Sequence, residues 1–220
     1  MEQEQVAKKP ARKQQQRSIK TRQKLLDAAL EAFSENGYGG TSTRDIAERA
    51  DVHHPLITYH FRNKEELWRA AADRIFSEFL ATLIEARRGA ESLPAGERMA
   101  VMIRTYVRYA AANPALHKLM LQESSRSSSR LDWLIDMHLR PLYQVVAREL
   151  KPLQESGIAQ SGDPALLFNL IRVASGGMLA LSLEIKATSG LDFDAADNVE
   201  ALADMIIRCF LPGLAQTTTA

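Results

Sequence analysis

The stretch Thr41–Lys64 reads TSTRDIAERADVHHPLITYHFRNK and predicts two short helices joined by a tight turn, followed by the start of a third helix. Ser42 supplies a hydroxyl for the N–H groups of the first helical turn, and Asp45 stands three residues later, as in a capping box. Asp51 marks the turn, because aspartate tolerates a left-handed backbone. Pro55 suits the first position of the second helix, where no N–H is needed.

The second of these helices has one predicted buried edge, because Ile57 and Phe61 stand four residues apart. The side chains left to point elsewhere are Leu56, Thr58, Tyr59 and His60. Two short helices that cross over a tight turn form a helix-turn-helix, whose second helix can enter the major groove of DNA. We therefore expect a DNA-reading head in this part of the chain.

Several residues in and around this stretch follow a familiar order and spacing: Gly37-Tyr38, Thr41-Ser42, Ile46-Ala47, Ala50, Val52, Tyr59-His60-Phe61 and Lys64. In this they resemble the N-terminal pattern of the tetracycline-repressor (TetR) family, and the resemblance covers roughly residues 17 to 70. There are two departures. Asp51 stands where such families usually carry glycine, and Thr58 stands where they often carry a tyrosine that touches DNA.

The resemblance implies a set of DNA contacts. Arg44 matches a position that can reach a guanine edge, while Tyr59 and Lys64 look like phosphate contacts. The complete expected set is Thr43, Arg44, His54, Pro55, Leu56, Thr58, Tyr59, His60 and Lys64. For each of these residues, a solvated surface position is the alternative.

Length and composition are those of an ordinary globular protein: 220 residues, of which 45% are hydrophobic and 25% charged. The formal net charge of +1 conceals an asymmetry, because residues 1–24 contain eight Lys or Arg and only two Asp or Glu. Such a basic start suits a module that binds a polyanion, although a solvated tail has the same composition.

The compartment follows from three features. The single cysteine, Cys209, cannot form an intramolecular disulfide and fits a reducing environment. The N-terminus lacks the apolar segment of a secretory signal. The most apolar segment, residues 166–185, is interrupted by Asn169 and Arg172 and indicates a buried helix instead of a membrane span. We expect a cytoplasmic protein without a membrane partner.

Catalytic and metal sites are not predicted. His53, His54 and His60 have the wrong spacing for a metal site, since adjacent histidines point to different sides and no cysteine or paired carboxylate joins them. The sequence shows no recognisable Ser-His-Asp order, phosphate-binding glycine loop or tuned carboxylate pair. We therefore expect neither an enzyme nor a bound cofactor.

The rest of the chain has helical spacing of its apolar residues and no strand-like alternation, which predicts an all-α fold of about nine helices. Long helices are expected over residues 130–155, with a kink at Pro141, over 164–187 and over 195–211. The predicted organisation is a disordered basic arm (1–17), a helix-turn-helix DNA-binding domain (18–63), a helical effector-binding and dimerisation domain (64–213) and a tail (214–220).

The middle helices carry methionine, aromatic and polar residues that are suited either to a plain core or to an adaptable binding site. The TetR resemblance implies a cavity there for a small, largely hydrophobic effector. The expected lining is Met102, Tyr106, Tyr109, His117, Met120, Trp133, Met137, His138, Phe168 and Arg172.

The last two long helices carry more apolar surface than one partner face requires, which fits core packing or a subunit interface. Because the TetR family dimerises through its two C-terminal helices, we expect a four-helix bundle between two subunits. The residues assigned to it are Leu170, Ala174, Gly177, Leu181, Leu202, Ile206 and Phe210. Two-fold symmetry suits a palindromic DNA site.

These observations together predict a homodimeric repressor that binds a palindromic operator in double-stranded DNA and is released by a small effector. The alternative is a helical ligand-binding dimer whose head contacts protein instead of DNA.

Overall fold

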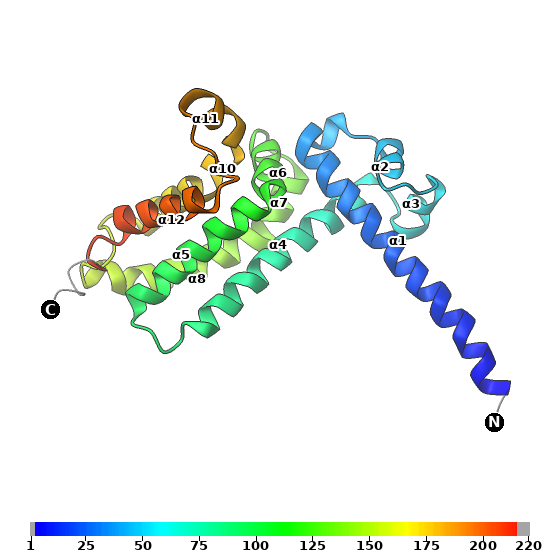
Figure 1. Ribbon diagram of the computed structural model, residues 1–220, viewed down its shortest axis with the longest axis horizontal. Coiled ribbons are helices and arrows are strands. Elements are labelled where there is room, and N and C mark those ends of the chain that lie inside the picture. The colour runs from blue at the N-terminus through cyan, green and yellow to red at the C-terminus, as the bar shows by residue number, and fades with distance from the viewer. Residues whose placement is uncertain (1–2, 215–220) are drawn as a thin grey trace. The chain divides into compact units, whose positions relative to one another are not determined.

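The structure, a computed structural model, describes residues 3–214, with side chains from residue 14 onward (Figure 1). The first four helices are α1 (Gln3–Gly40), α2 (Thr43–Arg49), α3 (Pro55–His60) and α4 (Lys64–Gly89). They are followed by α5 (Ala95–Ala112), α6 (Pro114–Ser124), α7 (Ser129–Leu134), the π-helical turn η1 (Ile135–Leu139) and α8 (Arg140–Glu155). The last elements are α9 (Pro164–Arg172), the π-helical turn η2 (Val173–Gly177), α10 (Met178–Ala180), α11 (Ser182–Ser189) and α12 (Ala196–Phe210). No strand occurs in residues 3–214, so the all-α prediction is confirmed.

The chain divides into two compact units between Arg74 and Ile75, inside α4. The sequence places this boundary at the start of α4 instead, between residues 63 and 64. The difference arises because Leu67, Trp68 and Ala71, on the first turns of α4, are almost fully buried and belong to the first unit. One helix therefore contributes core residues to both units.

The N-terminal helix α1 is longer than predicted. The disordered arm expected over residues 1–17 is wrong for residues 3–17, which are helical, and Figure 1 shows this part of α1 extending beyond α2 and α3. Lysine, arginine, glutamine and alanine are good helix formers, and extending an existing helix is easier than starting one. The helical backbone is interrupted at Gly37, the predicted stop, where φ is 68°, and α1 continues beyond this kink to Gly40. Residues 1–2 and 215–220, which include most of the expected tail, lie outside the described residues.

The core of the second unit forms where α5 packs on α12. Ile103 and Val107 on α5 are buried in the same cluster as Leu202 and Ile206 on α12. Ion pairs flank this contact, because Arg104 and Arg108 both bind Glu200. The hydrogen bond from Arg108, together with the smaller contribution of Arg104, lowers the pKa of Glu200 to about 2. The two helices are held by an apolar centre and a charged edge.

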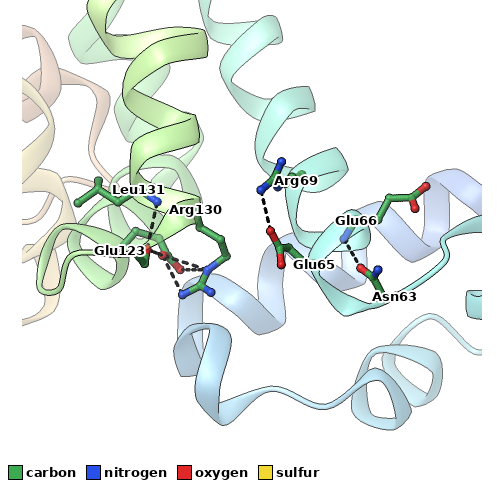
Figure 2. A network of polar contacts seen from close by, with 8 residues as sticks. Asn63, Glu65, Glu66, Arg69, Glu123, Arg130 and Leu131 are labelled. Carbon is green, nitrogen blue, oxygen red and sulfur yellow. Dashed lines mark hydrogen bonds and ion pairs between the residues drawn. The ribbon is translucent and has the colours of Figure 1, made fainter.

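The serine-rich connection between α6 and α7 is ordered by its own side chains. Ser128 caps α7, because its Oγ accepts a hydrogen bond of 3.1 Å from the N–H of Leu131 (Figure 2). Glu123, which is almost fully buried, accepts hydrogen bonds from Nε of Arg130 at 3.1 and 3.2 Å. The break that the SSRSSS run predicts is therefore a defined turn.

The long helix predicted over residues 130–155 is present as α7, η1 and α8, and the π-helical turn η1 ends just before Pro141. Proline has no N–H to donate and its ring crowds the carbonyl four residues earlier, so the chain widens there instead of continuing as a regular α-helix. The irregularity predicted at Pro141 is thus spread over the preceding turn.

The helix predicted over residues 164–187 is also divided. It begins as expected at Asp163, whose Oδ1 accepts from the N–H of Ala165 at 2.7 Å, but η2 and a break at Leu181 interrupt it. Within the described residues, no single helix is long and apolar enough to span a membrane. The segments Pro164–Ala180 and Ser182–Ser189 pass that test only as a pair, by length and composition, and are bent by 73°.

Candidate nucleic-acid interface and ligand cavity

The start of α2 is fixed by the predicted capping box. Oγ of Ser42 accepts from the N–H of Asp45 at 3.1 Å, and Oδ2 of Asp45 accepts from the N–H of Ser42 at 3.0 Å. The hydrogen bonds to Ser42, its side chain first, lower the pKa of Asp45, which keeps this carboxylate charged at the positive end of the helix dipole. Ile46 and Ala47 are buried beneath it, so one face of α2 packs inward while the other stays in solvent.

The turn between α2 and α3 has the left-handed residue that the sequence predicts: Asp51 has φ of 50°. A hydrogen bond of 3.0 Å from the N–H of Val52 to the carbonyl of Ala47 closes this turn. α3 then starts at Pro55, in the predicted place. The turn therefore sets the direction in which α3 leaves α2.

α3 is two-sided. Ile57 on the helix and Phe61 just after it are each 2% exposed and anchor it to the first unit. Thr58 is exposed on its outer side, and the ring of Tyr59 is 74% exposed. A short helix that presents polar and aromatic groups outward from a fixed base has the form of an element that enters a DNA groove.

A groove runs beside this helix in the first unit. It is lined by Thr41, Ser42, Thr43, His54, Ile57, Thr58, Phe61, Arg62, Asn63 and Lys64. Oγ1 of Thr43 lies 3.0 Å from Nε2 of His54, and Nζ of Lys64 lies 4.3 Å from the centre of the Tyr38 ring. Arg62 and Lys64 make the groove basic, and α2 and α4 both begin at its wall. Positive side chains in a groove favour a phosphate group.

The start of α4 has the predicted asparagine cap. Oδ1 of Asn63 accepts from the N–H of Glu66 at 2.8 Å (Figure 2). The side chain of Glu66 reaches back to the N–H of Arg62, at 3.3 Å, and not to that of Asn63. The cap holds Lys64, the first residue of α4, at the edge of the groove.

The nine residues predicted to contact DNA all belong to α2, α3 or the residues at their ends and at the start of α4. Arg44, His54, Pro55, Thr58 and Tyr59 are exposed, while Thr43, Leu56, His60 and Lys64 are half-buried. Sequence reasoning missed Arg62, whose side chain is 91% exposed beside the groove. The sequence feature that could have identified Arg62 is a basic residue directly after the buried Phe61.

One of the nine, His60, differs from the others in its surroundings. Burial, followed by the nearby charge of Arg22, lowers the pKa of His60. The ring of Tyr59 packs edge-on against the His60 ring, with centroids 4.9 Å apart. His60 is therefore suited to support Tyr59 as a neutral ring.

The second unit contains an apolar cavity of about 260 Å³. Its lining comes from α4, α5, α8 and α9 and consists of Phe79, Leu80, Leu83, Ile84, Arg87, Met99, Met102, Ile103, Tyr106, Pro141, Leu142, Val145, Val146, Glu149, Phe168, Ile171 and Arg172. Nε of Arg87 donates to Oε1 of Glu149 at 2.8 Å. A largely apolar cavity with few polar groups is the usual form of a small-molecule site.

One wall of this cavity is backed by a buried histidine. The hydroxyl of Tyr106 lies 2.8 Å from Nε2 of His117 and 3.5 Å from the carbonyl of Arg172. Burial is the main cause that raises the pKa of Tyr106 and lowers the pKa of His117, the latter to about 4. Both groups are therefore neutral at pH 7, and the hydroxyl of Tyr106 is a fixed polar group in a largely apolar wall.

The turn η2 packs tightly against the same histidine. A Cβ atom at Gly176 would lie only 1.7 Å from Nε2 of His117, so this position accepts glycine alone while His117 keeps its place. Within the part of the chain that the structure describes, Nδ1 of His117 and Oγ of Ser175, next to Gly176, are buried without a hydrogen-bond partner. The contact between α6 and η2 is therefore close, and two of its buried polar atoms lack a hydrogen bond among the described residues.

The predicted effector residues divide into two groups. Met102, Tyr106, Phe168 and Arg172 line the cavity, whereas Tyr109, His117, Met120, Trp133, Met137 and His138 lie outside its lining. Tyr109 instead donates to the carbonyl of Ile75 at 3.2 Å, and His138 stacks on Phe76 with ring centroids 4.9 Å apart. The helices α4 and α8, from which no effector residue was predicted, supply most of the missed lining.

The residues predicted to form a dimer interface are also divided. Leu170 and Leu181 are 56% and 48% exposed, while Ala174, Gly177 and Phe210 are half-buried. Leu202 and Ile206 are buried in the core of their own subunit, against α5, which leaves them little surface for a partner. The exposed apolar side chains of α9, η2, α11 and α12, with Leu181 before α11, are Leu166, Leu170, Val173, Leu181, Leu183 and Met205. We call these six residues the apolar face.

Residues 25–71 match the family described as bacterial regulatory proteins, tetR family. The chain is 36% identical over 61 residues to IcaR, the negative transcriptional regulator of the biofilm operon icaADBC in Staphylococcus epidermidis; that match covers 28% of this chain and 33% of IcaR. It is 25% identical over 214 residues to the probable acrEF/envCD operon repressor of Escherichia coli K12, with 92% of each chain covered.

Solved structures share the fold. The fatty acid degradation regulator FadR from Bacillus halodurans has a TM-score of 0.65 at 19% identity, covering 85% of this chain and 94% of that one. The transcriptional regulator FadR from Bacillus subtilis, solved in complex with stearoyl-CoA, has a TM-score of 0.64 at 20% identity, covering 85% and 98%.

Proposed function

Because residues 25–71 match the tetracycline-repressor (TetR) family of bacterial regulatory proteins, we propose that this chain belongs to that family, represses transcription as a homodimer on a palindromic operator and is released by a small effector. The observation that carries this proposal is the two-sided α3, anchored by Ile57 and Phe61 and presenting Thr58 and Tyr59 outward beside a basic groove.

In the proposed complex, α3 lies in the major groove of DNA. Arg44 on α2 is exposed and suits a guanine edge, which accepts two hydrogen bonds from an arginine. Lys64 and Arg62, together with the hydroxyl of Tyr59, suit phosphate oxygens. Phosphate contacts release counterions, so the affinity should fall steeply with salt concentration.

The proposed dimer uses the apolar face. Six large apolar side chains are exposed on the C-terminal elements, and exposed apolar surface often marks a site of protein association. Burying them between two copies would pair two heads, and a two-fold dimer reads two half-sites about 34 Å apart. The similarity to an Escherichia coli operon repressor over 92% of both chains supports the repressor role.

Release by an effector requires that the ligand and the DNA favour different conformations. The cavity is walled by Phe79, Leu83 and Arg87 of α4, and the first residue of the same helix, Lys64, lies in the basic groove. α4 is therefore the proposed connection. A change in occupancy from 1:99 to 99:1 needs about 5.5 kcal/mol of difference in ligand binding between the two states.

The test is selection of bound duplexes from a random DNA pool, followed by affinity measurements over a range of salt concentrations. We expect an enriched palindrome and a steep salt dependence. The variant Arg44→Ala/Tyr59→Ala should lose at least about tenfold in affinity for that palindrome, because base and phosphate contacts contribute about 1–3 kcal/mol each. Arg140→Ala, an exposed arginine on α8, is the matched control and should bind like the wild type.

Two outcomes would reject the proposal. One is a pool without an enriched sequence. The other is unchanged DNA affinity in the double variant, which would favour a head that contacts protein.

A further inference from the structure

The positive and negative side chains that line the cavity are unequal in number. Arg87, Glu149 and Arg172 line it, and the first two bind each other, with Nε of Arg87 and Oε1 of Glu149 2.8 Å apart. Nη2 of Arg172 donates to the amide oxygen of Asn169 at 3.2 Å, and within residues 14–214 Arg172 forms no ion pair. Arg172 therefore borders the cavity without a carboxylate partner among the described residues, and its hydrogen bond to Asn169 is exposed to solvent.

The charge of Arg172 affects the Tyr106 hydroxyl in the cavity wall. After burial, the positive charge of Arg172 is the next cause that shifts the pKa of Tyr106 and of His117, and it lowers both. The carbonyl of Arg172 is also within 3.5 Å of the Tyr106 hydroxyl. Arg172 and Tyr106 thus belong to the same end of the site.

The hydroxyl of Tyr106 can donate a hydrogen bond to a ligand. If the neutral His117 carries its proton on Nε2, it donates to the Tyr106 oxygen across 2.8 Å and leaves the phenolic hydrogen for another acceptor. The acceptor present here, the carbonyl of Arg172, is 3.5 Å away, which is a long and weak contact. An acceptor atom from a ligand would complete this arrangement.

The remaining walls are apolar, with Leu83, Met102, Val146 and Phe168 among them. A cation beside an apolar cavity loses part of its hydration, and an anion with matching geometry compensates for that loss. We propose that the cavity binds an amphipathic monocarboxylate, whose carboxylate pairs with Arg172 and accepts from Tyr106 while its apolar body fills the space between α4, α5 and α8. This inference rests on the proposed function, because the ligand is the effector of that repressor.

The size of the cavity limits the ligand. The volume of the cavity is about 260 Å³. That space suits a medium-length chain or a small ring system, and a saturated ten-carbon chain is a suitable probe.

Three probes with the same chain separate charge from apolar burial: decanoate, decanamide and decyltrimethylammonium. Their affinities for the full chain are measured by titration calorimetry below the critical micelle concentrations. Decanoate should bind at least about tenfold more tightly than decanamide, because only the carboxylate forms a charge-assisted pair with the guanidinium in which both groups are ionised. The cationic probe should bind most weakly. Equal binding of decanoate and decanamide to the wild type would overturn the proposal without any variant.

Two matched arginine variants locate the charge. Arg172→Gln should remove the preference for decanoate over decanamide, whereas the double variant Arg87→Gln/Glu149→Gln should keep it, because it removes a paired arginine together with its carboxylate and leaves the net charge of the lining unchanged. A preference that persists in Arg172→Gln would overturn the assignment, with unchanged far-ultraviolet circular dichroism as the check on folding.

The two proposals fail separately. A protein that selects an operator but binds none of the three probes would overturn the ligand class and leave the repressor standing. A protein that binds decanoate through Arg172 but selects no DNA sequence would overturn the repressor and leave the ligand class standing.

Discussion

The imidazole Nε2 of His117 lies 2.8 Å from the phenolic oxygen of Tyr106, so a histidine on α6 holds a residue of the cavity wall from behind. His117 is 8% exposed, and its burial lowers its pKa to about 4. The neutral ring is therefore part of the folded structure, and protonating it opposes folding.

The stability of the protein should consequently depend on pH through His117. The unfolded state binds a proton near the ordinary pKa of 6.5, whereas the folded state does so only near 4, so stability is lost as the pH falls through this window. The loss is on the order of 3 kcal/mol at pH 4 relative to pH 7.5. Urea unfolding at several pH values, for the wild type and for His117→Gln, isolates this contribution. Identical pH profiles for the two proteins would contradict it.

Replacing Gly176 by alanine should destabilise the protein by about 1–3 kcal/mol, because the new Cβ would meet Nε2 of His117. In the His117→Ala background the same change should cost much less, and the difference measures the coupling of the two positions. Gly177→Ala is the matched control in the same turn, since its Cβ would meet only the side chain of Val173, with Cγ1 at 3.3 Å and Cβ at 3.9 Å. Equal costs of Gly176→Ala in both backgrounds would reject this contact.

Loss of the cap on α2 should weaken the first unit. Ser42→Ala removes the acceptor for the N–H of Asp45 and should cost about 1 kcal/mol in unfolding free energy. Ser77→Ala, at an exposed position within α4, should change the stability by less than about 0.5 kcal/mol. Thermal unfolding of the two variants gives the comparison, and similar melting temperatures would argue against the cap.

A charge on the apolar face should separate the proposed dimer without unfolding the subunit. Leu170 is 56% exposed, so Leu170→Glu leaves the core intact but places a carboxylate in the interface. Leu121→Glu, at a position 54% exposed on α6, should stay dimeric. Sedimentation velocity reports the mass of each variant. A dimeric Leu170→Glu would exclude this face as the interface.

Local signals in the sequence were sufficient for α2, the turn after it and α3. Ser42 with Asp45, Asp51 and Pro55 each act on neighbouring backbone atoms, so their effect does not depend on distant packing. The same reasoning found Asn63 at the start of α4. Capping and turn residues were therefore reliable guides to where each helix begins.

The cavity could not be predicted in the same way, because its lining comes from four helices whose mutual approach depends on side-chain packing. Leu83 and Val145 have the spacing of ordinary core residues, yet they border the cavity. Trp133 and His138 have the composition of a binding site, yet their rings pack against each other, 5.5 Å apart, outside the lining. Residue type alone did not distinguish these cases.

The helical segment from Pro164 to Ala180, which contains the π-helical turn η2, should tolerate little change in its length. Each residue of an α-helix turns the chain by about 100°, so deleting or inserting one residue between Pro164 and Ala180 would rotate everything that follows by that angle. Such a change would move Gly176 away from His117 or turn Leu181 away from the apolar face. Natural variation in this segment should therefore occur by substitution, with single-residue insertions and deletions confined to the loops on either side.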